Sequence, residues 1–138
     1  MKTTMLAFAA LLALAPAAFA ATENYSADLK ASNQVPANDS KGTGALTATY
    51  DTASKKLTYT VTYKDLTGPA TMAHFHGPAD AKTNAPVVVP AKDAASPIKG
   101  EATLTDAQAA DLQGGKWYFN VHTEKNKGGE IRGQVMKK

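Results

Sequence analysis

Residues 57–63 read Leu-Thr-Tyr-Thr-Val-Thr-Tyr, and this segment decides the fold class of the chain. Its large apolar residues occupy every second position, and threonine occupies the positions between them. Alternation with a period of two is typical of a β-strand that buries one face, and threonine, valine and tyrosine all favour strands. The segment therefore predicts an antiparallel sheet with one buried face and one solvated face.

Similar segments lie on both sides of this strand, separated by clusters of Gly, Pro, Asn, Asp and Ser. The strands that they predict are residues 25–31, 45–50, 57–63, 71–76, 87–89, 98–104, 116–123 and 130–136. Residues 51–56 are expected to connect a hairpin. Pro86 and Pro90 bracket the strand at 87–89 and place it at an edge, because proline cannot donate to a ladder.

Helical character occurs once, after the sixth strand. Thr105 and Gln108 have the spacing of a capping box, and residues 107–112 continue to Gly114 and Gly115, which end the helix after one or two turns. Short antiparallel strands with one helical turn predict an all-β fold, specifically an immunoglobulin-like or Greek-key β-sandwich. A closed barrel is the alternative.

The first twenty residues have the features of a secretory signal peptide. Lys2 precedes an unbroken apolar run at 5–15, and Ala18-Phe19-Ala20 is a small-x-small cleavage site. We therefore expect a signal peptide at residues 1–20 and one domain at residues 21–138, located in the periplasm or secreted. No apolar run of about 18 residues follows, so no membrane insertion is expected once the signal is removed.

Composition excludes several classes of function. The chain of 138 residues has 15 Lys+Arg against 12 Asp+Glu, and Arg132 is its single arginine among scattered lysines, which argues against a nucleic-acid partner. Without cysteine there is no disulfide and no thiolate nucleophile, so any metal must be held by nitrogen or oxygen. Sequence motifs for nucleophilic hydrolysis or for nucleotide binding are missing as well. Catalysis would therefore have to depend on a metal.

All three histidines of the chain, His74, His76 and His122, fall in two predicted strands. Residues i and i+2 of a strand share a face about 6.6 Å apart, so His74 and His76 can converge on one ion. If the two strands are neighbours, His122 completes a three-nitrogen site that suits copper or zinc and keeps a position open. The alternative is that these histidines are surface or hydrogen-bonded residues without a metal.

Three further residues are expected to lie next to this site, either behind the metal ligands or in contact with an anion. Met72 shares the face of His74 and offers a thioether to Cu(I), or simply packs. Asn120 shares the face of His122. Arg132 forms a salt bridge or a fork to a carboxylate or loop carbonyls, or it lies beside the histidines and attracts an anion.

The sequences at residues 72–79 (MAHFHGPA), 118–123 (YFNVHT) and 128–134 (GGEIRGQ) resemble those of a CHRD domain. The resemblance covers residues 22–137 and implies an all-β, immunoglobulin-like fold. CHRD domains are named after chordin, an extracellular antagonist of growth-factor signalling, and they also occur singly in exported bacterial proteins. The resemblance therefore implies a location and a fold more directly than an activity.

A weaker resemblance concerns the order of the histidine motifs. His-x-His on one strand, followed by Val-His-Thr-Glu-Lys, Gly-Gly and a final strand, is similar to the copper half of copper/zinc superoxide dismutases. This resemblance implies that the three histidines match copper ligands and that Arg132 lies near an anion-guiding arginine. The chain departs from that family because it has no fourth histidine, no zinc loop and no cysteine.

The sequence thus predicts an exported CHRD binding module that holds one copper ion on His74, His76 and His122, without requiring catalysis. A metal-free structural or protein-interaction domain is the alternative, in which an extracytoplasmic protein contacts the loops at 33–44 and 80–95. A copper-dependent oxidoreductase acting on superoxide is a third hypothesis.

Overall fold

The computed structural model describes residues 10, 12–15 and 19–138, so most of the expected signal peptide lies outside the described residues. Within the described part of the chain, no helix combines the length and hydropathy that a membrane crossing needs. The folded domain begins with the first strand at Thr22 and continues to the last strand at Lys137.

The eight predicted strands are all present, with boundaries that differ from the prediction by at most three residues. They are β1 (Thr22–Lys30), β2 (Thr43–Asp51), β3 (Lys56–Lys64), β4 (Ala70–His76), β5 (Val87–Pro90), β6 (Ile98–Thr103), β7 (Trp117–Thr123) and β8 (Ile131–Lys137). The helix α1 (Asp106–Gln113) begins with the expected capping box, in which Thr105 and Gln108 each accept a hydrogen bond from the other's backbone N–H. A 3-10 turn, Ala31–Asn33, ends the first strand one residue earlier than predicted.

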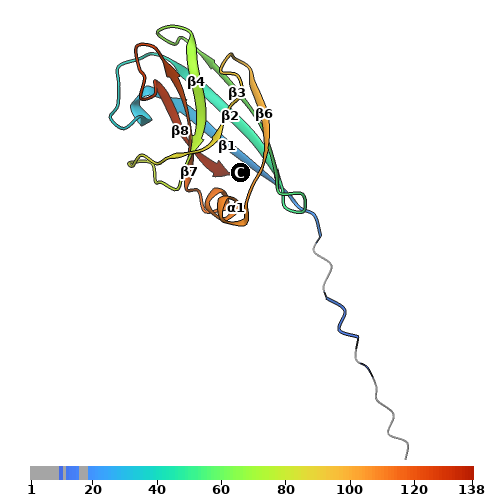
Figure 1. Ribbon diagram of the computed structural model, residues 1–138. Helices are drawn as coiled ribbons and strands as arrows, with labels where there is room; N and C mark the ends of the chain where they lie inside the picture. Colours follow the sequence, from blue (N-terminus) through green and yellow to red (C-terminus); the bar gives the residue numbers. More distant parts are fainter. Residues whose placement is uncertain (1–9, 11, 16–18) are drawn as a thin grey trace, which may run out of the picture.

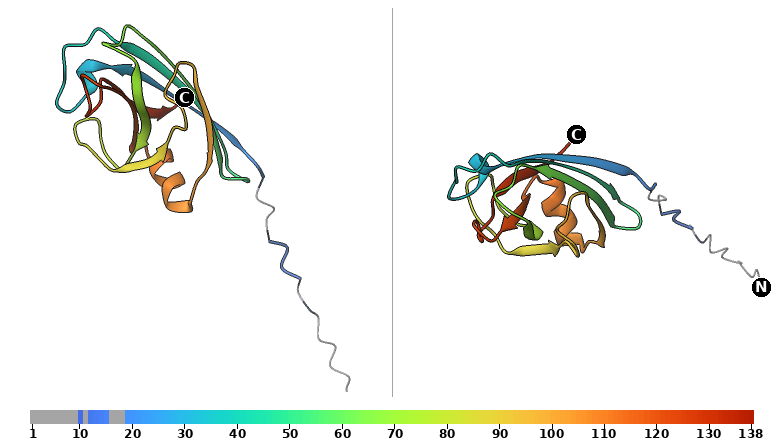
Figure 2. Two further views of the ribbon diagram at one scale, coloured as in Figure 1. Left: turned by 45° about the horizontal axis from the view of Figure 1, so that its top comes forward. Right: turned by 90° about the horizontal axis from the view of Figure 1, so that it is seen from above.

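The described strands form a single sheet in the order β5-β4-β7-β8-β1-β2-β3-β6, and every neighbouring pair is antiparallel. The sheet curls until it is nearly barrel-shaped, so that its two halves face each other as the layers of a sandwich do (Figures 1 and 2). The all-β antiparallel fold class is therefore confirmed. The short strand β5 lies at an edge, as its flanking prolines predicted.

The two halves meet through the alternating apolar residues that the sequence identified. Tyr59 of β3 contacts Phe75 of β4 edge-on, with ring centroids 4.9 Å apart, and Phe75 contacts Phe119 of β7 at 4.8 Å. Leu57 and Val61 are fully buried beside them. Burial of each such side chain contributes about 1.5–3 kcal/mol, so this aromatic cluster holds β4 and β7 against the opposite half.

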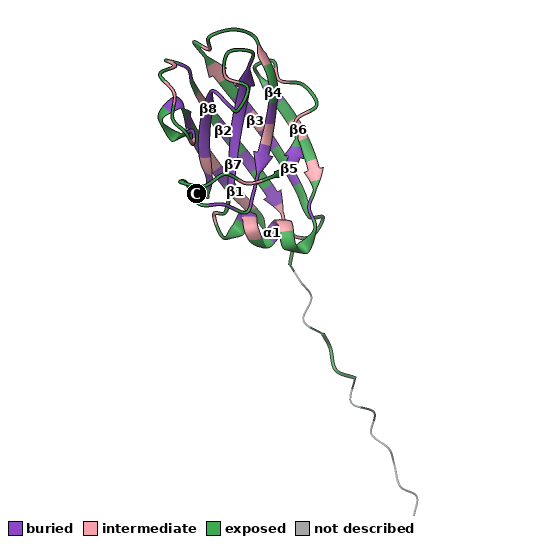
Figure 3. Ribbon diagram, turned by 60° about the vertical axis from the view of Figure 1, so that its left-hand side comes forward, coloured by how far each residue is buried: buried purple, intermediate pink, exposed green. Residues whose placement is uncertain are grey.

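The outer face of β7 is also buried, contrary to the expectation that it is solvated. All seven residues of the strand are buried (Figure 3). His122 and Arg132 do point away from the apolar core, but two loops, residues 77–86 and 124–130, lie over them and accept their hydrogen bonds. The expectation was wrong because the alternation of residues within a strand does not indicate which loops lie over its outer face.

Candidate metal centre

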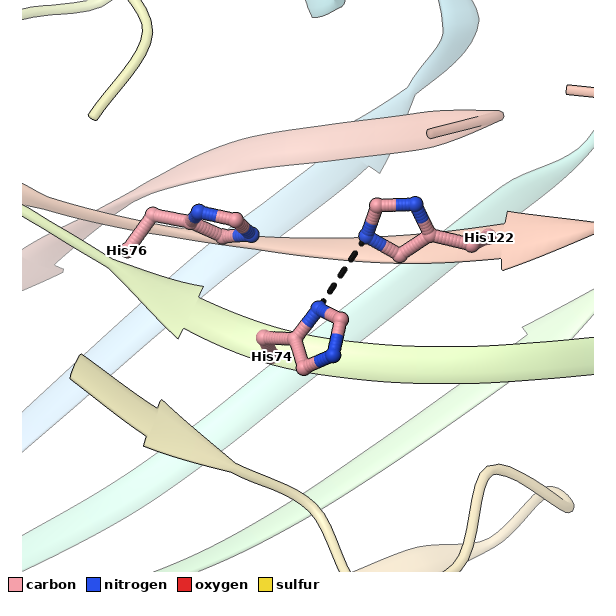
Figure 4. A group of neighbouring side chains, drawn as sticks. All are labelled: His74, His76 and His122. Atoms are coloured by element: carbon pink, nitrogen blue, oxygen red, sulfur yellow. Dashed lines mark hydrogen bonds between the residues drawn. The ribbon is translucent and has the colours of Figure 1, made fainter. Parts of the chain in front are cut away.

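The histidines of β4 and β7 meet on the covered outer face because these two strands are neighbours. In their register, Met72 lies opposite His122 and His74 lies opposite Asn120. Nitrogen atoms of His74, His76 and His122 all lie within 4.8 Å of one another (Figure 4). The structure thus brings together the three residues that the sequence singled out.

His76 and His122 are each oriented by a backbone carbonyl of a covering loop. Nδ1 of His76 lies 2.9 Å from the carbonyl oxygen of Ala85, and Nδ1 of His122 lies 2.7 Å from that of Lys127. A carbonyl only accepts hydrogen bonds, so each ring carries its proton on Nδ1 and has a lone pair on Nε2 when neutral. A metal-binding histidine is typically oriented in this way, with its second nitrogen donating to a carbonyl or carboxylate.

The two Nε2 atoms point to the same place. Each lies 2.9 Å from Oδ1 of Asn120. Asn120 is 3% exposed, and it lies between Tyr118 and His122 on the same face of β7. The sequence identified Asn120 as a candidate residue behind the ligands or in contact with an anion. The structure places its amide group at the centre of the cluster.

His74 is the accessible member of the cluster. Its ring is half-buried, and its Nδ1 lies 3.1 Å from Nε2 of His122. Burial, together with the neighbouring His122 and His76, lowers the pKa of His74 to about 4, and burial also lowers the pKa of His76. Both rings are therefore neutral at pH 7, which is the form that binds a metal ion.

The cluster can be compared with the dimensions of a metal site. Three nitrogens that each lie about 2.0 Å from one tetrahedral ion are about 3.3 Å apart. Separations of up to 4.8 Å require the rings to move by about 1 Å, within reach of small side-chain rotations. Three imidazoles without thiolate or carboxylate suit copper, zinc and nickel, and copper binds such sites most tightly.

Tyr118 of β7 and Arg132 of the neighbouring strand β8 extend the cluster. The ring of Tyr118 is parallel to that of His76, with centroids 4.7 Å apart, and Cζ of Arg132 lies 3.5 Å from the Tyr118 centroid. Since β7 lies between β4 and β8, Tyr118 links the imidazole to the guanidinium. Sequence reasoning gave no role to Tyr118, although its alternation with Asn120 and His122 places it on the same face.

Arg132 holds the loop that orients His76. Its guanidinium donates to Oδ1 of Asn84 at 2.9 Å and to the carbonyl oxygens of Asp80 and Thr83 at 3.0 and 2.6 Å. The side chain is 1% exposed, so these donors face loop 77–86 and not solvent. Arg132 therefore forms a fork to loop oxygens, which was one of the two roles left open by the sequence.

Met72 lies at the accessible side of the cluster. Its side chain is 50% exposed, and its backbone pairs with that of His122.

Glu130 fixes the second covering loop, which orients His122. This carboxylate is fully buried and accepts hydrogen bonds from donors on three segments: Ser40, the backbone and side chain of Thr67, Thr123 and Asn126. Burial acts to raise the pKa of Glu130, but the hydrogen bonds from Thr67, Thr123 and Asn126 outweigh it and lower the pKa to about 2. Sequence reasoning missed this role, because nothing in the local alternation marks a buried carboxylate.

Comparison with known proteins gives one match. A family model described as the CHRD domain matches residues 25–135. No curated protein and no solved structure matches the chain. The matched region contains the three histidines, both covering loops and all eight strands except the ends of β1 and β8.

Proposed function

We propose that this chain, which belongs to the CHRD domain family, is a binding module that holds one transition-metal ion on His74, His76 and His122, with copper as the preferred metal. The proposed location is the periplasm or the extracellular medium. The proposal requires binding only and assigns no redox reaction to the ion.

One observation carries the proposal. Two loops distant in sequence, at Ala85 and Lys127, each hold one imidazole by Nδ1, so that both Nε2 lone pairs converge. Histidines that only fill space or make one hydrogen bond have no need of this common direction. His74 then approaches within 3.1 Å of His122 from the neighbouring strand and offers a third nitrogen.

Copper is preferred for two reasons. The donors are imidazole nitrogens, and divalent copper has the highest affinity among the divalent first-row metals for nitrogen sites. The chain also has no cysteine, so no thiolate competes for a thiophilic ion elsewhere in the protein. The half-buried His74 marks the side from which an ion reaches the cluster.

The test is a calorimetric titration of the protein with Cu²⁺, comparing the wild type with His74→Gln. His74 is chosen because its hydrogen bond to His122 is internal to the cluster, whereas His76 and His122 also hold loops. We expect one equivalent of copper to bind the wild type, and the variant to bind at least about tenfold more weakly, since even residues behind a ligand contribute 10–100-fold.

Thr71→Gln is the matched control, since Thr71 lies on the same strand and is exposed. We expect it to bind copper as the wild type does. Equal affinities of the wild type and His74→Gln would reject the proposal. The three histidines would then belong to a metal-free structural or protein-interaction domain.

A further inference from the structure

We infer that Asn120 supplies a fourth donor to the metal through Oδ1, so that the site consists of three imidazole nitrogens and one amide oxygen. This inference rests on the proposed function and assigns a ligand that the histidine pattern does not include. Asn120 is buried and comes from β7, two residues before His122.

The first step of the argument concerns protons. His76 and His122 each use the Nδ1 proton on a loop carbonyl, so their neutral rings have no proton left on Nε2. An amide oxygen has no proton either. Yet Oδ1 of Asn120 lies 2.9 Å from both Nε2 atoms. The Nδ1 proton of His74 can be donated to Nε2 of His122. Nε2 of His76 and Oδ1 of Asn120 still face each other as two acceptors, which is unfavourable unless the amide turns over or a positive charge lies between them.

The second step concerns distances. Two ligands about 2.0 Å from one ion are about 2.8 Å apart when they meet at a right angle and about 3.3 Å apart in a tetrahedral site. The two contacts of Asn120 measure 2.9 Å, and His74 Nδ1 lies 3.1 Å from His122 Nε2. The two contacts of Asn120 are close to the right-angle spacing, whereas the spacing between His74 and His122 lies between the two values. Right angles characterise tetragonal sites of nitrogen and oxygen donors and favour Cu²⁺.

The third step explains why an amide suits this position. Without an ion, the amide can turn over and present the two hydrogens of its NH₂ group, one to each Nε2 lone pair. With an ion, the oxygen faces the metal. An aspartate in this place would satisfy only the second state, because a carboxylate has no hydrogen to donate at neutral pH.

The loop that orients His122 also confines the amide of Asn120. Gly129 has φ 120°, and a Cβ atom at this position would lie only 2.7 Å from Nδ2 of Asn120. The backbone of the loop therefore packs directly against the amide, and a side chain at position 129 is excluded. This contact keeps Asn120 between the two imidazoles.

The experiment compares copper binding by the wild type, Asn120→Leu and Asn120→Asp. Leucine has a similar size but no donor atom, whereas aspartate retains an oxygen. We expect Asn120→Leu to bind Cu²⁺ at least about tenfold more weakly, and Asn120→Asp to bind at least as tightly as the wild type. If Asn120→Leu does not fold, the comparison of Asn120→Asp with the wild type decides the test.

Pulsed electron paramagnetic resonance supplies a direct readout. In wild-type protein labelled with ¹³C at the asparagine side-chain carbonyl, we expect a ¹³C coupling to bound Cu²⁺ together with signals of three imidazoles. Three imidazole signals without a ¹³C coupling would overturn the inference while the proposed function stands. A copper affinity of Asn120→Leu or Asn120→Asp contrary to these expectations would do the same. No copper binding by the wild type would reject both.

Discussion

Nδ1 of His74 lies 3.1 Å from Nε2 of His122, although 48 positions separate the two residues in the sequence. The contact exists because β4 and β7 are neighbours in the sheet, with Met72 opposite His122 and His74 opposite Asn120. Any change that slides one strand by a single residue would place the histidines on opposite faces. The register of β4 and β7 therefore determines the candidate metal centre.

The three histidines should differ in their contribution to stability. His76 is 8% exposed, donates to Ala85 and stacks on Tyr118, so His76→Ala should lower the free energy of unfolding by about 2–3 kcal/mol. His74→Ala removes a half-buried ring with one contact inside the cluster and should cost less than about 1 kcal/mol. Urea unfolding of the metal-free proteins measures both values. Equal losses would contradict the distinction between the two positions.

Arg132→Lys should weaken the loop that orients His76. A lysine cannot reach the oxygens of Asp80, Thr83 and Asn84 together, and it loses the planar contact with Tyr118. We expect a loss of about 2–3 kcal/mol in unfolding free energy and faster amide hydrogen exchange in residues 77–86.

Lys82→Ala is the control for this substitution, because Lys82 is an exposed residue of the same loop. It should leave stability and exchange at wild-type values. If amide hydrogen exchange in residues 77–86 were unchanged in Arg132→Lys, the loop would hold its position without the guanidinium.

Glu130 should make stability depend on pH in the acid range. Its pKa of about 2 in the folded protein is below the ordinary value of 4.5, so the ionised carboxylate stabilises the fold above pH 4.5. This stabilisation, on the order of 3 kcal/mol, is lost as the pH falls from about 4.5 to 2. In Glu130→Gln, the free energy of unfolding at pH 7 should be lower and its decline over this range smaller.

Glu124→Gln is the matched control, since Glu124 lies in the same loop with a side chain that is 82% exposed. Urea unfolding of this variant between pH 7 and pH 2 should follow the wild-type curve. If Glu130→Gln also followed that curve, the hydrogen bonds to the carboxylate would not be the source of the acid dependence.

Much of the fold could be predicted from local pattern alone. In β3, Leu57, Tyr59 and Val61 repeat every second position and are all buried, as are Trp117, Phe119 and Val121 of β7. The same alternation placed Asn120 and His122 together on the outer face. Such a prediction is possible because consecutive residues of a strand point to opposite faces, so a strand with one apolar face shows that difference as alternation in the sequence.

Other features depend on contacts between distant segments, and no local pattern records them. The pairing of β4 with β7 was only a condition of the histidine hypothesis. The burial of Arg132 depends on the carbonyl of Thr83, and that of Glu130 depends on donors from Ser40 and Thr67. The position of Asn120 between two imidazoles follows only once the loops at 77–86 and 124–130 are in place.

The central claim is that His74, His76 and His122 bind one copper ion together. The most direct measurement is a crystal structure of the protein loaded with one equivalent of Cu²⁺, with anomalous scattering recorded at the copper edge. We predict a single anomalous peak about 2.0 Å from one nitrogen of each histidine. A peak elsewhere on the protein, or none at the three histidines, would contradict the account.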